Sequence, residues 1–302
     1  MMPPRATELQ PTEAAPPAHP QATEGRLELR FHAAAGQPTR LRSLVQQPPL
    51  RVVRTFPLPE GGALAHLHNV SGGVLGGDQL RLDVTLEPQT RVQLTTTGAT
   101  RIYRHRPALP VANQQSRFHV GAGALLELLP DALIPYRNAR YHQATHYRLD
   151  DDAGLMAWET VSPGREAHGE LFAYDELALR TEIWAGNTPL ALEQILLEPA
   201  TGSPASPARL GRYRYFTTFY ACRVGQPPAL WSELEGQMSD LALQLSHAGE
   251  MIWGASTLPA HGVVVRGLSL NHRMLAAALP LFWGLARRRL YGADAIPPRK
   301  VY

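Results

Sequence analysis

The segment Gln79-Leu80-Arg81-Leu82-Asp83-Val84-Thr85-Leu86-Glu87 decides the fold class of this chain. Its even-numbered positions are Leu, Leu, Val and Leu, and its odd-numbered positions are polar or charged. Because a β-strand sends successive side chains to opposite faces, this alternation predicts a strand with one buried face and one exposed face. Pro88 follows and is expected to end the strand, since proline has no N–H to donate to a ladder.

Similar short segments recur every 10 to 15 residues or so and are separated by turn residues, which is typical of β architecture. They lie at 27–31, 92–94, 117–120, 125–129 and 177–184. Two faint repeats accompany them: Gly121-Ala122-Gly123 precedes a strand as Pro88-Gln89-Thr90 does, and Leu86-Glu87-Pro88 recurs at 197–199. Together these features predict a mainly β fold of short strands, a β-helix-like layered scaffold.

The C-terminal third has helical spacing instead. Ser232 and Glu235 form a capping-box pattern, so a helix is expected over 232–247. A second helix is predicted from Asn271, as N-cap, to Tyr291, with a kink at Pro280 and a stop at Gly292. The arginines at 287–289 fall in its last turn, where cations favour the helix dipole. A binding patch is the alternative interpretation of these arginines.

The two ends of the chain differ in composition. Residues 1–24 are rich in Pro, Ala, Thr and Gln and contain almost no aliphatic side chains, so they predict a disordered leader. No strong linker interrupts the rest, and residues 25–302 are expected to form a single domain.

Composition argues against several classes of protein. Charged residues make up 18% of the chain and the net charge is +3, with no basic block outside 287–289, so a nucleic-acid partner is not expected. Cys222 is the only cysteine and cannot form an internal disulfide. No apolar run approaches the roughly 20 residues of a membrane helix, and no signal peptide is evident. We therefore expect a cytoplasmic protein without membrane association.

The most unusual segment runs from His66 to Asp78 and holds the glycine pairs Gly72-Gly73 and Gly76-Gly77. Glycine admits positive φ and close approach of another backbone. A phosphate-binding loop is one interpretation, but the next element is a strand and no Lys-Ser/Thr pair follows. A tight turn that positions Asp78 is the better supported one.

Candidate chemistry is sparse. His66 and His68 share a face if they lie on a strand, and imidazoles bind nickel and zinc. Taken alone, the pair is better explained by a solvated strand face. Glu159, Glu166 and Glu170 lie near one another in sequence, and two carboxylates can in principle serve a hydrolase as acid and base, although proximity in sequence does not give their spacing in the fold. There is no Gly-x-Ser-x-Gly elbow and no His-Glu-x-x-His motif, so no recognisable active site is assembled and the chain is predicted not to be an enzyme.

Several segments, taken together, resemble the urease accessory protein UreD (UreH) family. They are the glycine-rich run 71–88, Leu94-Thr-Thr-Thr-Gly-Ala-Thr-Arg-Ile-Tyr-Arg104, the run 126–136, Trp158-Glu159 with Pro163-Gly-Arg165 and Gly169-Glu170, and Pro297-Pro-Arg299. They occur in the family's order and extend over nearly the whole chain after the leader.

This resemblance implies a non-catalytic, β-rich chaperone. It would bind apo-urease and a UreF-like protein, through which a UreG-like GTPase is recruited, and it would help deliver nickel. No tightly bound cofactor is implied, only transient nickel. Asp78 is predicted to line a nickel passage, with His66, His68, Glu159 and Glu170 as further donors, and Thr100 and Arg165 occupy motif positions. The C-terminal helices are the expected partner surface, unless they pack wholly on the β core.

Two other functions stay open from sequence. One is a hydrolase that uses the glutamates or the histidines, which turnover by the isolated protein would reveal. The other is a scaffold that assembles the urease complex without touching nickel, which metal stoichiometry would separate from delivery.

Overall fold

The computed structural model describes residues 22–298, and most of this span is β-structure. The two α-helices both lie in the C-terminal third, so the predicted mainly β class is confirmed. The first strand begins at Glu24, the last residue that we assigned to the leader. The rest of the predicted leader, residues 1–21, lies outside the described residues.

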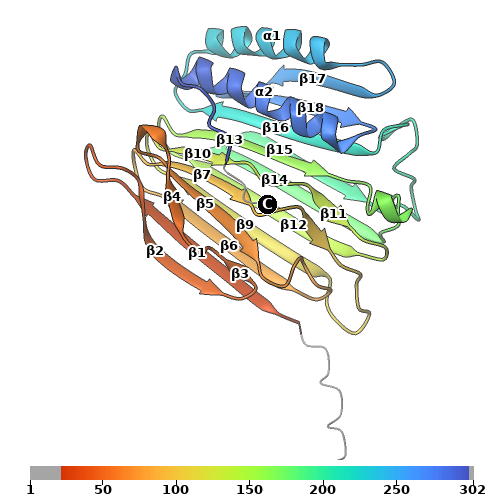
Figure 1. The fold of residues 1–302 in the computed structure, drawn as a ribbon. Coiled ribbons are helices and arrows are strands. Elements are labelled where there is room, and N and C mark those ends of the chain that lie inside the picture. Colours follow the sequence, from red (N-terminus) through yellow and green to blue (C-terminus); the bar gives the residue numbers. More distant parts are fainter. Residues whose placement is uncertain (1–21, 299–302) are drawn as a thin grey trace, which may run out of the picture.

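A seven-stranded sheet forms one layer of the molecule (Figure 1). Its strands, in spatial order, are β15 (Thr188–Leu197), β14 (Glu176–Ala185), β12 (Arg140–Leu149), β9 (Ala112–Val120), β6 (Gln79–Leu86), β1 (Glu24–His32) and β2 (Arg40–Gln47). The five from β14 to β1 are parallel, and the antiparallel strands β15 and β2 form its edges.

An eleven-stranded sheet forms the second layer. Its main path is β17 (Met251–Thr257), β18 (Gly262–Ser269), β16 (Tyr215–Arg223), β13 (Gly154–Val161), β10 (Leu125–Leu128), β7 (Arg91–Thr96), β5 (Ala63–Asn69) and β3 (Leu50–Arg51). The short strands β4 (Thr55–Pro57), β8 (Thr100–Ile102) and β11 (Leu133–Pro135) pair beside this path. Strands β5, β7, β10 and β13 are parallel.

From β5 to β14 the chain alternates between the two sheets, and each turn of the chain adds one parallel strand to each sheet. The connecting turns stack on one another: the Gln89 N–H donates to the Ala122 carbonyl at 3.0 Å, and the Gly123 N–H donates to the Asp151 carbonyl at 2.9 Å. The repeat that links 88–90 with 121–123 therefore marks successive turns of a solenoid, as predicted. The repeat at 197–199 lies at the end of an antiparallel strand, outside this stack.

The two sheets enclose an apolar core. Alternate side chains from the facing strands are buried in it, among them Leu29 and Leu82 from the first sheet and Leu94, Leu126 and Leu155 from the second. Strand β6 matches the prediction from its alternating sequence, since its four aliphatic residues are buried.

Helix α1 (Pro228–Leu245) starts four residues before Ser232, so the predicted capping box is not formed. Pro227 is the N-cap and makes no side-chain cap bond. Proline at the first helical position provides the start instead, because its fixed φ suits a helix and it has no N–H to leave unpaired. Helix α2 (His272–Tyr291) begins as predicted: the Asn271 side chain accepts from the Arg273 N–H, and Gly292 caps the end at φ 63°.

Both helices cover the outer face of the eleven-stranded sheet near its β16–β18 end (Figure 1). A second apolar core fills this interface, with Trp231, Met238, Phe282 and Trp283 packed against Met156 and its neighbours. Neither helix is long and apolar enough to cross a membrane.

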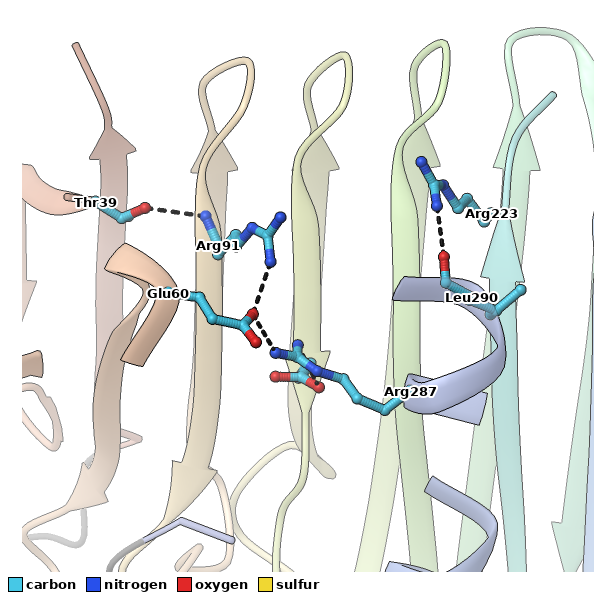
Figure 2. A network of polar contacts seen from close by, with 7 residues as sticks. Thr39, Glu60, Arg91, Arg223, Arg287 and Leu290 are labelled. Carbon is cyan, nitrogen blue, oxygen red and sulfur yellow. Dashed lines mark hydrogen bonds and ion pairs between the residues drawn. The ribbon is translucent and has the colours of Figure 1, made fainter. Parts of the chain in front are cut away.

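Buried charges fix the end of α2 to the solenoid (Figure 2). Arg287 is only 5% exposed, and its guanidinium donates a hydrogen bond to the Glu60 carboxylate at 3.0 Å. The same carboxylate also accepts a hydrogen bond from Arg91 at 2.8 Å. Arg287 also pairs with the buried Glu127 at 3.2 Å, and the Trp283 indole N–H donates to the same carboxylate. Arg287 is thus a tertiary anchor, whereas sequence reasoning treated it as one of three helix-end cations.

Candidate functional site

The glycine-rich segment is a tight turn between β5 and β6. Gly72, Gly73 and Gly77 have φ values of 77°, 156° and 100°. A Cβ at Gly73 would lie 2.4 Å from the Arg101 carbonyl oxygen, and one at Gly76 would lie 2.7 Å from that of Arg104. The glycines therefore allow the 101–106 backbone to pass directly against the turn, which explains why both pairs are needed.

Asp78 closes this turn. Its side chain is 2% exposed, and its Oδ2 accepts the Leu75 N–H at 2.9 Å. Burial raises the pKa of this carboxyl, while the hydrogen bonds from Leu75 and from the Thr23 side chain oppose the rise. Asp78 is positioned by the turn as expected, but it lines none of the three cavities between the two sheets. Its assignment to a nickel passage stays a prediction.

The histidines lie on β5, and their i, i+2 spacing places them on one face of the strand. The His66 ring packs edge-on against Phe56, and His68 lines the cavity at the end of the strand. Burial, followed by the neighbouring His66, lowers the pKa of His68. Among residues 22–298 no group of three or more His, Cys, Asp or Glu side chains converges as a metal site, so the pair is not joined by a carboxylate there.

Three adjoining cavities run between the two sheets. The first, of about 310 Å³, is bordered by His68, Gly72, Gly73 and Thr100. The second, of about 110 Å³, shares five lining residues with the first: Leu67, Leu82, Thr96, Thr100 and Gln114. The third, of about 20 Å³, shares Glu159, Thr181 and Tyr220 with the second. The shared walls place the three cavities in a row between the two sheets, and we call this row the inter-sheet path.

The two ends of the path differ. Exposed residues (Gly72, Thr97, Gly98 and Arg101) border the first cavity, so the path opens to the surface there. The third cavity lies where β15, an edge strand of one sheet, faces β16 of the other.

The lining of the path is unusually polar for the interior of a sandwich. The second cavity is bordered by hydroxyl and amide side chains, namely Thr96, Thr100, Gln114, Ser116, Gln143, Thr145 and Thr181. Hydrogen bonds satisfy several of these side chains, such as Thr96 with Asp131 and Gln114 with Ser116, and their oxygen atoms border the cavity.

Glu159 stands where the second and third cavities meet. It is half-buried and lines both of them. Burial raises its pKa to about 7; a hydrogen bond from Gln143 opposes the rise, and the negative charge of Glu193 adds to it. A carboxylate with such a pKa exchanges its proton near neutral pH, which suits a group that binds and releases a cation.

Sequence reasoning missed Glu193. It lies on β15 and lines the third cavity, where it accepts hydrogen bonds from Tyr220 and from Arg266. The β15 sequence alternates only weakly, and nothing near Glu193 carries a motif. Only the fold brings it toward Glu159.

Glu170 and Arg165 form a clamp outside the path. The Arg165 Nε donates to Glu170 at 2.9 Å, the Arg137 N–H donates to the same carboxylate, and the Arg165 guanidinium stacks on Tyr136. Arg165 holds the pKa of Glu170 below its usual range. Glu159 and Glu170 therefore do not form the carboxylate pair of a hydrolase, since one faces the path and the other is bound to arginine.

The remaining candidate nucleophile is inert. Cys222 is fully buried, and burial raises the pKa of its thiol to about 12. Its thiolate, which is the reactive form, is thus disfavoured.

Comparison with known proteins agrees with this architecture. The family model for the UreD urease accessory protein matches residues 23–302. A urease accessory protein UreD from Herpetosiphon aurantiacus is 43% identical over 278 residues, covering 92% of this chain and 96% of that protein. Those from Deinococcus radiodurans (35%, covering 82% and 86%) and Paenarthrobacter aurescens (31%, covering 92% and 96%) are also similar. The chain belongs to the UreD urease accessory protein family.

Proposed function

We propose that the chain is a non-catalytic chaperone of urease maturation. It binds apo-urease and a UreF-like accessory protein, and through the latter a UreG-like GTPase, and it helps deliver nickel to the urease active site in the cytoplasm. Family membership supports the maturation role. The nickel step depends on one observation, the polar inter-sheet path with Glu159 inside it.

The chemistry of the path suits a divalent cation in transit. Carboxylate, hydroxyl and amide oxygens are weak to moderate ligands, and a complete cage of donors would hold the ion rather than pass it on. Glu159 and Glu193 supply charge at one place, and threonine hydroxyls border the cavities before it. On this proposal nickel is cargo, and the protein has no tightly bound cofactor of its own.

Binding of a cation at Glu159 would displace its proton. Because the pKa of Glu159 is about 7, the carboxylate is half protonated at neutral pH and accepts a cation without the cost of a permanently buried charge. Asp78, His66 and His68 are proposed as accessory donors at the open end, with His68 the only one of the three that borders the path.

The helical face is proposed as the UreF-like docking surface. Leu243 of α1 and Leu281 of α2 are 78% and 49% exposed, whereas the opposite faces of both helices are buried on the sheet. Hydrolysis of GTP is assigned to the UreG-like partner. In the chain itself Cys222 is buried and Glu170 is bound by Arg165, so neither serves as a nucleophile or base.

The test is co-expression of the chain with the cognate urease subunits and accessory proteins. Glu159→Ala should lower the nickel content of purified urease several-fold, while the amount of urease recovered with the tagged chain stays unchanged. Glu250→Gln, an exposed change in the loop before β17, is the matched control. Unchanged nickel would remove Glu159 from the route and favour a scaffold that does not touch metal. Loss of the complex itself would assign Glu159 to assembly.

A further inference from the structure

An excess of arginine surrounds the open end of the inter-sheet path. The five parallel strands of the seven-stranded sheet begin at this end, and the connections that lead into β6, β9 and β12 arrive there (Figure 1). Five exposed arginines lie on these connections or beside them, and we call them the arginine rim: Arg51, Arg101, Arg104, Arg106 and Arg137.

Backbone contacts hold three of the rim residues against the mouth. The Val74 N–H donates to the Arg101 carbonyl at 2.8 Å, and the Tyr103 N–H donates back to the Val74 carbonyl at 2.9 Å. Gly76 lies against the backbone of Arg104 and Arg106. Arg101 also borders the first cavity directly.

The other two members lie in the neighbouring layers. Arg51 on β3 is the register partner of His68, which borders the same cavity. Arg137 follows β11, which pairs with β8, and the His105 N–H donates to the adjacent Asn138 carbonyl. The rim is therefore one surface built from three successive layers of the solenoid.

Within the part of the chain that the structure describes, the rim arginines have almost no carboxylate partners. Over residues 22–298 no carboxylate lies within ion-pair distance of Arg51, Arg101, Arg104 or Arg106, and Arg137 has only Glu170, at 3.7 Å. Glu170 is already bound by Arg165. Elsewhere on the first sheet the pattern is the opposite, since arginines of the outer face such as Arg26, Arg81 and Arg140 pair with carboxylates.

We propose that the arginine rim docks an acidic face of apo-urease. This inference rests on the proposed function, and three arguments carry it. Uncompensated arginines at a surface are complementary to carboxylates and can bind them bidentately. The rim surrounds the mouth through which a transported ion would pass, so the receiving protein belongs there. The helical face, proposed for the UreF-like partner, is built from other elements of the chain.

Docking would also change what the mouth admits. In the free protein the unneutralised guanidinium groups repel a divalent cation that approaches from solvent. An acidic partner surface that covers the rim removes this repulsion. Contact with urease would thus make the path permeable to nickel only when the receiver is in place.

A nucleic acid is the competing ligand for an arginine cluster. Single strands are bound along a basic groove with exposed aromatic rings for base stacking. The rim residues lie instead on separate connections beside an opening, and the two nearby tyrosines, Tyr103 and Tyr136, pack edge-on against each other. The geometry therefore favours a protein face.

The experiment is recovery of purified cognate apo-urease by the tagged full-length chain, and separately of the purified UreF-like protein. Arg101→Glu/Arg104→Glu should lower urease recovery more than tenfold and leave UreF-like recovery unchanged. Arg101→Lys/Arg104→Lys should retain urease recovery, since lysine keeps the positive charge. The matched control is Arg40→Glu/Arg117→Glu, which changes the net charge by the same amount on other surfaces of the protein. For the wild type, urease recovery should fall as the NaCl concentration rises. Thermal unfolding checks that all variants fold.

Each contrary outcome has a distinct meaning. Equal urease recovery by the wild type and the glutamate variant overturns the rim inference and leaves the proposed function standing. Loss of the UreF-like protein instead of urease also overturns it, as does wild-type recovery that a nuclease abolishes. A wild type that recovers neither protein overturns the proposed function together with the rim.

Discussion

Replacement of Glu159 by glutamine should make the protein more stable at alkaline pH and should flatten its pH dependence. The pKa of Glu159 is raised from an ordinary 4.5 to about 7, mainly by burial. Between these values the folded chain retains a proton that the unfolded chain has lost. Stability therefore falls as pH rises through this window and stays lower above it.

The size of the effect follows from the two pKa values. A rise from 4.5 to about 7 corresponds to about 3 kcal/mol, at about 1.4 kcal/mol for each pH unit. Glutamine is neutral at every pH and is isosteric with the protonated acid, so its amide can keep the contact with Gln143. We expect Glu159→Gln to gain up to about 3 kcal/mol over the wild type at pH 8 and almost nothing at pH 4.5.

The assay is urea unfolding of the full-length chain at several values of pH from 5 to 8, for the wild type, Glu159→Gln and the exposed control Glu250→Gln. The wild type and the control should lose stability in parallel as pH rises, while Glu159→Gln should lose less. Parallel curves for all three would refute the reasoning, because they would mean that Glu159 ionises freely in the folded state.

Three further predictions concern packing and reactivity. Arg287→Met should lower the free energy of unfolding by about 3–5 kcal/mol, measured by thermal unfolding, because Glu127 would be left buried without its partner. The double variant Arg287→Met/Glu127→Gln should recover much of this stability. Losses that add in the double variant would contradict this. Gly73→Ala should destabilise the chain by several kcal/mol, because its Cβ would meet the Arg101 carbonyl at 2.4 Å, and an unaltered melting temperature would show that the turn can relax. Cys222 should resist thiol reagents in the native protein and react only after unfolding, so rapid labelling of the folded chain would contradict its burial.

Sequence predicted the first sheet far better than the second. Strands such as β6 have one face on the core and one in solvent, so apolar and polar residues alternate. Strand β13 is covered by the first sheet on one side and by α2 on the other, and its sequence Gly-Leu-Met-Ala-Trp-Glu-Thr-Val shows no such alternation. Strands β16 and β18 were missed for the same reason, whereas β17 was missed although its burial alternates.

Prediction of the site was limited by contacts between distant segments. Motif positions indicated Glu159 and Thr100, and both border the inter-sheet path. Glu193 and the Glu127–Arg287 pair had no local signal, because the partners lie on strands and helices far apart in sequence. Glu127 lies within the predicted strand at 125–129, and only the position of α2 shows that it is covered.

The late position of α2 in the chain has a consequence for biosynthesis. This helix supplies about a third of the buried residues of the second core and, among residues 22–298, the one cation paired with Glu127. Two strands beneath it, β10 and β13, leave the ribosome more than a hundred residues earlier. A nascent chain therefore presents Met156, Trp158 and a buried acid to solvent until translation is almost complete. Messages truncated before codon 272 should yield aggregates rather than a shorter folded protein, so the last tenth of the coding sequence protects all that precedes it.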